Sequence, residues 1–276
     1  MSIRLGIAGV VLVTMALLST RDGRAFAQDA QGSAPSQPAP SQPPAVPDAP
    51  SAAAAREILS AMAKAYADCT SYRDTGTVST KFSSLGTVSA DSFGGERSNR
   101  LEFKTAFVRG GSFRFEYWDL DGHAAHKPYI IASDGKTVRS WWHVKPGVET
   151  AASLGMAIAG ATGVSSGSAH HIPRLLLPEI DGWPLTAVVD PRLDGEETLD
   201  GHVCLKLVAR HSNGDPWTLW IDKDSHLVRQ LFRSHEFADK GFRTEQTTIY
   251  KPEVDVTIDP SELAFNPPEA EEPDER

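Results

Sequence analysis

The stretch LEFKTAFVRGGSFRFEY, residues 101–117, carries the clearest structural signal in the chain. Large apolar side chains alternate with charged ones on both sides of the Arg109-Gly110-Gly111 segment. Successive side chains of a strand point to opposite faces, and paired glycines suit a tight reversal of the backbone. The stretch therefore predicts a β-hairpin with one apolar and one polar face, as in an antiparallel sheet that is covered on one side.

Three dipeptides predict further hairpins outward from this one. Asp134-Gly135, Asp200-Gly201 and Asn213-Gly214 stand next to apolar runs, and such dipeptides favour the tight turns of antiparallel strands. The strands expected around these turns, and two that complete the series, cover residues 129–131, 138–144, 197–199, 203–208, 217–222, 227–232 and 244–250.

Two other segments predict helices. Residues 52–68 place apolar side chains at spacings of three and four, with Ser51 as the expected N-cap. Residues 151–178 contain small helix-prone residues, then glycines, then an apolar patch between prolines, and we expect them to cross the sheet as a lid. The predicted fold is α+β: a single curved antiparallel sheet, or unclosed β-barrel, with helices and a helical lid on its concave face.

The N-terminus predicts export to the periplasm. Arg4 precedes an apolar run at residues 5–18, which is shorter than the roughly 20 residues that a membrane-spanning helix needs. Ala25-Phe26-Ala27 matches the small-x-small pattern of a signal peptidase site. We expect residues 1–27 to be a signal peptide and Gln28 to be the mature N-terminus. An uncleaved N-terminal anchor is the alternative.

Composition divides the remaining chain into three parts. Residues 28–50 are rich in Pro, Ala, Ser and Gln, which predicts a disordered linker because few side chains there can be buried. Residues 51–268 form the folded domain, and residues 269–276 are an acidic tail. The net charge is −9, and no basic patch is visible, so a nucleic-acid partner is not expected.

The chain has two cysteines, Cys69 and Cys204. An oxidising compartment favours disulfides, so we predict that they pair. Two separate buried thiols are the alternative. A zinc site is not expected, because zinc needs further ligands that the neighbouring sequence does not supply.

Two patterns could suggest chemistry. Residues 163–167 match the serine hydrolase pattern G-x-S-x-G, but a predicted helix precedes them instead of the strand that this nucleophile turn requires. A Gly/Ser hinge within the lid is the better interpretation. His123 and His126 follow two aspartates, and His170-His171 come later, but solvated histidines explain this scatter better than a metal site. We expect no metal, no cofactor and no catalytic residue.

The aromatic residues of the apolar face are the candidate binding residues. They share one side of the hairpin: Phe103, Phe107, Phe113, Phe115 and Tyr117. Large apolar walls with few polar groups suit a pocket for acyl chains. An ordinary core beneath the helices would use the same residues, and periodicity does not separate the two interpretations.

Two of these stretches resemble a known family. Residues 108–117 (VRGGSFRFEY) resemble the R-P-G-x-F-R-W-x-Y strand of the periplasmic lipoprotein carriers, LolA and its LolB- and RseB-like relatives, with Gly110 in place of the usual proline. Residues 129–138 (YIIASDGKTV) are similar to the family's I-V-S-D-G-K-x-L/V hairpin, at the same distance downstream. Residues 71–72 and 219–222 also fit in order, so the resemblance covers roughly residues 52–268.

The resemblance implies an unclosed β-barrel with a helical lid over a hydrophobic concave face. It further implies a monomeric, non-enzymatic periplasmic protein that carries acyl chains or lipoproteins. The alternative is an RseB-like sensor or scaffold that binds another envelope protein, and a hydrolase ranks third.

Overall fold

The computed structural model describes residues 49–86, 97–121 and 127–268. The predicted signal peptide, residues 28–48 of the predicted linker, the acidic tail, His123 and His126 lie outside these residues and stay predictions. Residues 49 and 50 belong to the first helix and not to the linker. Within the described residues, no helix combines the length and apolar character needed to cross a membrane.

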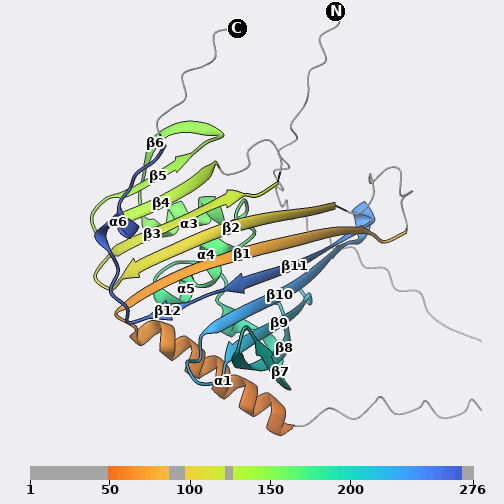
Figure 1. Cartoon of the computed structure of the whole chain (residues 1–276). Helices are drawn as coiled ribbons and strands as arrows, with labels where there is room; N and C mark the ends of the chain where they lie inside the picture. Colours follow the sequence, from red (N-terminus) through yellow and green to blue (C-terminus); the bar gives the residue numbers. More distant parts are fainter. Residues whose placement is uncertain (1–48, 87–96, 122–126, 269–276) are drawn as a thin grey trace, which may run out of the picture. The chain divides into compact units, whose positions relative to one another are not determined.

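Twelve described strands form one antiparallel sheet, as predicted (Figure 1). The order across it is β6-β5-β4-β3-β2-β1-β11-β10-β9-β8-β7, and β12 pairs with one end of β1. The first six strands are β1 (Ser71–Ser84), β2 (Arg97–Val108), β3 (Ser112–Asp119), β4 (Pro128–Asp134), β5 (Val138–Trp142) and β6 (Lys145–Ala151). The others are β7 (Val189–Leu199), β8 (His202–Arg210), β9 (Pro216–Asp222), β10 (Val228–Phe237), β11 (Phe242–Tyr250) and β12 (Glu253–Val254).

The predicted turns join the strands as expected. The two stretches that resemble the carrier family meet at their turns, because a Cβ on Gly111 would lie 2.7 Å from the Cα of Gly135. Both glycines have positive φ, which side chains tolerate poorly. The strand predicted at 138–144 is shorter than expected: β5 ends at Trp142, residues 143–144 form a turn, and the chain reverses into β6, which was not predicted. All but the last residue of β6 are exposed, so this strand has no apolar alternation to detect.

The helices are α1 (Ala49–Asp68), α3 (Leu154–Thr162), α4 (Ser168–His171), α5 (Pro173–Leu176) and α6 (Pro260–Leu263), with short 3-10 turns at Leu185–Ala187 and Ala238–Lys240. We call α3–α5 the lid. The predicted first helix is confirmed, but it begins at Ala49, so Ser51 is not its N-cap. The Ser51 hydroxyl instead donates to Leu193 O and accepts from Leu193 N in β7.

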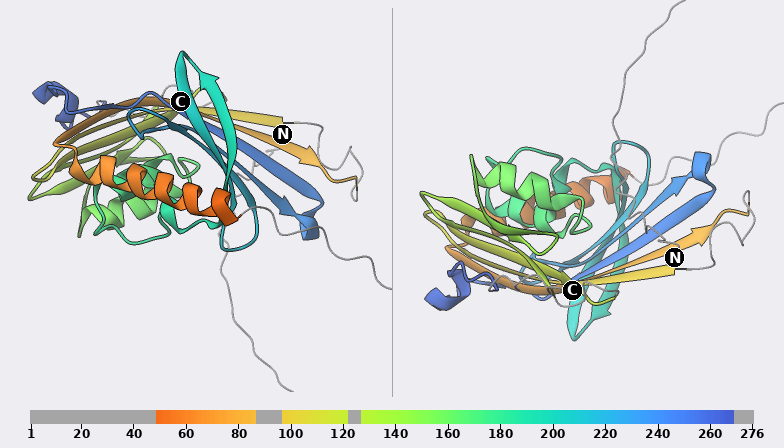
Figure 2. Two further views of the ribbon diagram at one scale, coloured as in Figure 1. Left: turned by 90° about the horizontal axis from the view of Figure 1, so that it is seen from below. Right: turned by 90° about the horizontal axis from the view of Figure 1, so that it is seen from above.

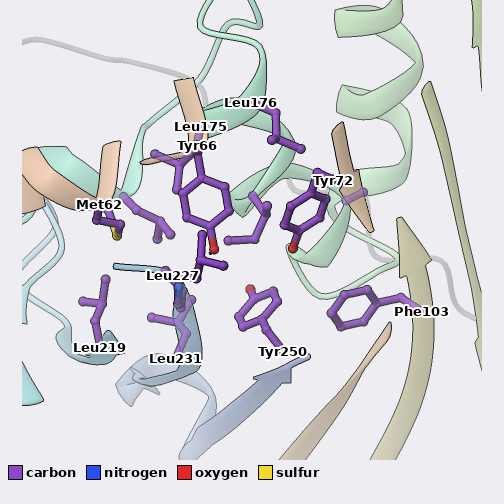
Figure 3. Packing of buried hydrophobic residues seen from close by; sticks show 14 of the residues in the cluster. Met62, Tyr66, Tyr72, Phe103, Leu175, Leu176, Leu219, Leu227, Leu231 and Tyr250 are labelled. Atoms are coloured by element: carbon purple, nitrogen blue, oxygen red, sulfur yellow. Dashed lines mark hydrogen bonds between the residues drawn. The ribbon is translucent and has the colours of Figure 1, made fainter. Parts of the chain in front are cut away.

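The core lies between the concave face of the sheet and the helices (Figure 2). Helix α1 supplies Leu59, Met62 and Tyr66, and the lid supplies Ile158 and Leu176. Figure 3 shows the Tyr66, Tyr72 and Tyr250 rings packed among leucines, with their hydroxyls directed toward one another. Burying this much apolar surface is the main stabilising contribution to the fold.

The predicted disulfide is not formed in the structure: Cys69 and Cys204 are both free and buried. Each thiol has a separate local partner. Cys69 Sγ donates to Tyr66 O at the end of α1, whereas Cys204 Sγ lies 3.6 Å from His202 O in β8. Burial raises the pKa of both thiols, which keeps them protonated and unreactive. This corresponds to the alternative of two separate buried thiols.

Candidate functional site

The concave face of the sheet has two halves. Residues opposite each other in paired strands share a face, so the strand registers define rows of side chains across the sheet. The rows nearest α1 lie beneath that helix and the lid, and we call them the covered half. Figure 2 shows the far ends of β1, β2, β10 and β11 extending past the helices, and we call the rows there the open half.

The five predicted binding residues lie together in the covered half. Phe103 pairs with Tyr117 and Phe107 with Phe113 between β2 and β3, and Phe115 stacks on Phe103 with ring centroids 6.2 Å apart. Each is at most 4% exposed. The structure therefore places all five in the core beneath the helices, and their role as a binding wall stays a prediction.

One glycine makes room for this aromatic row. Gly76 of β1 stands opposite Phe103, and a Cβ there would lie 2.2 Å from the Phe103 ring and 2.5 Å from Ile249 O. The ring of Phe103 can lie flat on the sheet only because residue 76 has no side chain.

Arg109 of the predicted hairpin ties this half together. Its guanidinium donates to Tyr66 O and Cys69 O at the end of α1, and to Leu176 O at the end of the lid. These carbonyls are among the last of their helices and lack intrahelical partners. One side chain of the β2–β3 turn therefore binds the C-terminal ends of α1 and α5.

The G-x-S-x-G segment is structural in this fold. Ser165 is fully buried, and its hydroxyl donates to Thr162 O and accepts from Ala169 N. Ser166 and Gly167 have positive φ and form the turn between α3 and α4. A Cβ on Gly167 would lie 2.7 Å from the His171 ring, so this turn needs glycine. These positions fit the predicted Gly/Ser hinge of the lid.

The open half combines aromatic and polar residues. Its first row is Thr80, Gln246, Arg233 and Trp217; its second is Phe82, Thr244 and His235; its third is Ser84, Phe242 and Phe237. The phenylalanines are half-buried and contact one another: Phe237 and Phe242 stack at 4.5 Å, and Phe82 lies 6.5 Å from Phe242. An apolar strip therefore lies on a part of the sheet that α1 and the lid do not cover.

A hollow of about 340 Å³ lies beside this strip and is lined by residues of β9, β10, β11 and the turn before β9. We call it the Arg233 pocket. It is lined by His211, Asn213, Asp215, Trp217, Arg233, Ser234, His235, Phe237, Thr244 and Gln246. The sequence analysis missed these residues, although Arg233, His235 and Phe237 alternate along one strand and could have been grouped by that spacing.

A polar centre lies inside the covered half. Asp74 is 1% exposed, and its Oδ1 accepts from Lys251 N at 2.8 Å. Among the residues that the structure describes, neither Asp74 Oδ2 nor the Tyr72 hydroxyl has a hydrogen-bond partner. Burial raises the pKa of Asp74 to about 7, so the carboxyl is partly protonated at neutral pH. Burial likewise raises the pKa of Tyr66, Tyr72 and Tyr250, which keeps these phenols neutral.

The histidines in the described residues do not assemble into a metal site. Among these residues, no group of three or more His, Cys, Asp or Glu side chains could hold an ion. His171 is buried in the core, where burial lowers its pKa and keeps the ring neutral. Its Nδ1 lies 3.4 Å from the Tyr250 hydroxyl, and its ring packs edge-on against Trp217.

The fold and this face define an open antiparallel sheet with a partly covered concave surface. Solved structures with similarity to it include MucB (17% identity over 78% of this chain and 63% of MucB, TM-score 0.42). A DUF1329 family protein from Desulfovibrio piger is 12% identical over 77% of this chain and 97% of its own, with a TM-score of 0.35. A domain named for outer membrane lipoprotein sorting, from Vibrio parahaemolyticus, is 11% identical over 77% and 97%, with a TM-score of 0.34.

No protein-family model matches the chain, and no curated protein matches its sequence. At such identities and TM-scores the likenesses concern the fold, so the function proposed below rests on the geometry of this chain.

Proposed function

We propose that this chain is a non-enzymatic binding protein of the bacterial cell envelope that holds an acyl chain on its concave face. The observation that carries the proposal is the strip of half-buried phenylalanines on the open half, Phe82, Phe237 and Phe242. This strip lies beyond the row of Thr80, Gln246 and Arg233. It belongs to the ends of β1, β10 and β11, which extend past α1 and the lid (Figure 2).

An acyl chain suits this surface for physical reasons. It is long, flexible and apolar, so each methylene that leaves water for the aromatic strip contributes about 0.8 kcal/mol. A strip open on one side gives only part of that contribution, which keeps the ligand releasable, as a carrier requires. The covered half, with Phe103 and Phe115, would become accessible only if the lid moved away from Arg109.

Binding can be tested with a fluorescent fatty acid on the purified mature protein. A charge on the strip should abolish binding, so Phe237→Asp is the test variant. Phe232→Asp is the matched control, since Phe232 lies on the same strand and on the opposite face. The proposal predicts that only the first variant loses affinity while both stay folded by circular dichroism. Equal binding by wild type and Phe237→Asp would contradict it.

Mass spectrometry of the native protein separates a carrier from a sensor. Copurifying acyl lipids would support the carrier. A protein without lipid but with a stable envelope protein bound to it would support the sensor or scaffold instead. N-terminal sequencing of the same sample tests export, for which the expected first residue is Gln28.

A further inference from the structure

Arg233 is a half-buried cation that has no counter-ion among the described residues. Within the described residues, no carboxylate oxygen lies within 4.0 Å of its guanidinium, whereas Arg73, Arg100, Arg229 and Arg243 all have one. Its Nη2 donates to Ser166 O and to Gln246 Oε1, both at 2.7 Å. Burial lowers the pKa of Arg233 from its usual value, and the nearby Tyr250 and Asp215 act in the opposite direction.

A buried charge is costly unless an opposite charge accompanies it. A guanidinium has five N–H groups, and the two bonds of Nη2 leave those of Nε and Nη1. The described residues supply no hydrogen-bond acceptor for these groups. Among the described residues, the Arg233 side chain therefore has no anion as a partner, and its Nε and Nη1 groups are available to a ligand or to water.

The nearest carboxylate is already engaged. Asp215 Oδ2 lies 2.6 Å from His235 Nδ1 and accepts from Asn213 Nδ2 at 2.8 Å. The negative charge of Asp215 raises the pKa of Arg233, but the two side chains do not form an ion pair. The charge of Arg233 therefore faces a hollow that is large enough for a small group.

The walls of the Arg233 pocket suit an oxyanion attached to an apolar body. Trp217 lies under the guanidinium, with its ring centroid 6.0 Å from Arg233 Cζ. Phe237 also lines the pocket and belongs to the apolar strip of the open half. An acyl chain on that strip would place its polar end beside Arg233.

We propose that the Arg233 pocket binds the oxyanion end group, carboxylate or phosphate, of an anionic acyl ligand. This rests on the proposed function, because the chain of the same ligand would lie on the phenylalanine strip. Planar guanidinium groups bind both oxyanions with short, charge-assisted hydrogen bonds. The bound anion would supply the missing counter-ion.

The pocket also adjoins the lid. Arg233 Nη2 and Gln246 Nε2 both donate to the Ser166 carbonyl, in the turn between α3 and α4. An oxyanion on Arg233 therefore lies next to the point where the lid is fixed to β10 and β11. End-group binding and lid position share one side chain.

Three ligands with the same chain test the end group: hexadecanoic acid, hexadecyl phosphate and hexadecanol. We expect wild type to bind at least one anion about tenfold or more tightly than the alcohol, since hydrogen bonds to charged groups are strong. The anion with the larger preference identifies the end group. Arg233→Gln should bring the ratio of affinities close to one, and Arg233→Lys should keep part of it. Arg243→Gln is the matched control, since it removes a cation from the other face of β11 and should keep the full preference.

The outcomes separate the two proposals. Equal binding of acid, phosphate and alcohol by wild type would refute the oxyanion site and leave acyl binding intact. Absence of binding for all three would refute the proposed function, and a preference that survives in Arg233→Gln would refute the role of Arg233. If Arg233→Gln does not fold, Asp215→Asn decides: removal of this nearby negative charge should raise the anion preference several-fold, and an unchanged preference refutes the site.

Discussion

Replacing Asp74 with asparagine tests whether a carboxyl group titrates inside the core. Asparagine keeps an oxygen that can accept from Lys251 N, and it replaces the unpaired Oδ2 with a group that cannot ionise. The variant therefore changes little except the charge. Its effect should depend on pH.

The size of the effect follows from the pKa of Asp74. An aspartate of the unfolded chain has a pKa of about 3.9, whereas burial raises the pKa of Asp74 to about 7. Between these values the folded state keeps a proton that the unfolded state has released, so stability falls as pH rises through this range. The full loss above the folded pKa is on the order of 4 kcal/mol, and about 2–3 kcal/mol of it falls between pH 5 and pH 8.

The measurement is urea unfolding of wild type and Asp74→Asn at several pH values. The variant should gain stability relative to wild type by about 2–3 kcal/mol between pH 5 and pH 8. In thermal unfolding this corresponds to a relative gain of roughly 4–12 °C for a domain of this size. Comparing the two proteins cancels the titration of all other groups. A difference that stays constant across this pH range would show that the carboxyl does not titrate there.

Three further outcomes are expected. Gly76→Ala should destabilise the domain by about 1–3 kcal/mol in urea, because the Cβ of the alanine would overlap the Phe103 ring and Ile249 O. An unchanged urea midpoint would mean that the strands around residue 76 move apart without loss of stability. Phe115→Asp should unfold the domain by circular dichroism, because a buried unpaired carboxylate costs several kcal/mol; a folded variant that has lost only fatty-acid binding would make the covered half a water-accessible pocket. Denatured protein without reductant should titrate two thiols, since Cys69 and Cys204 are free in the structure; the absence of titratable thiols would restore the predicted disulfide.

The fold was largely predictable because its signals are local. Alternation in residues 101–117 and the Asp-Gly turns each depend on a few neighbouring residues, and each formed as expected. Strand β6 was missed because it is exposed and therefore carries no alternation. Whether Cys69 and Cys204 can form a disulfide depends on how α1 and β8 are placed relative to each other, and no local sequence pattern predicts that placement.

The candidate site was predictable only in part. The alternation of side chains along the strands placed Phe103 and Phe115 on one face. Which residues of that face stay uncovered depends on where the helices end along the sheet. The pairing of Arg233 with Gln246 and Trp217 joins β9, β10 and β11, and the nearby carbonyl of Ser166 comes from a distant turn. A single arginine within a strand gives no sign that it lacks a counter-ion.

The pairing of β1 with β11 has a consequence for the order of folding. Strands β1–β6 and β7–β11 are two series of neighbours in sequence, and only the β1–β11 ladder, from Gly76–Tyr250 to Ser84–Phe242, joins them into one sheet. Polypeptides are made from the N-terminus, so β1 waits with one unpaired edge until β11, near the end of the described domain, has been synthesised. Because contacts so distant in sequence form slowly, we expect the joining of the two series to be a late step of folding. A chain that stops before Phe242 would retain an exposed β1 edge next to aromatic residues, which is the combination most prone to aggregate.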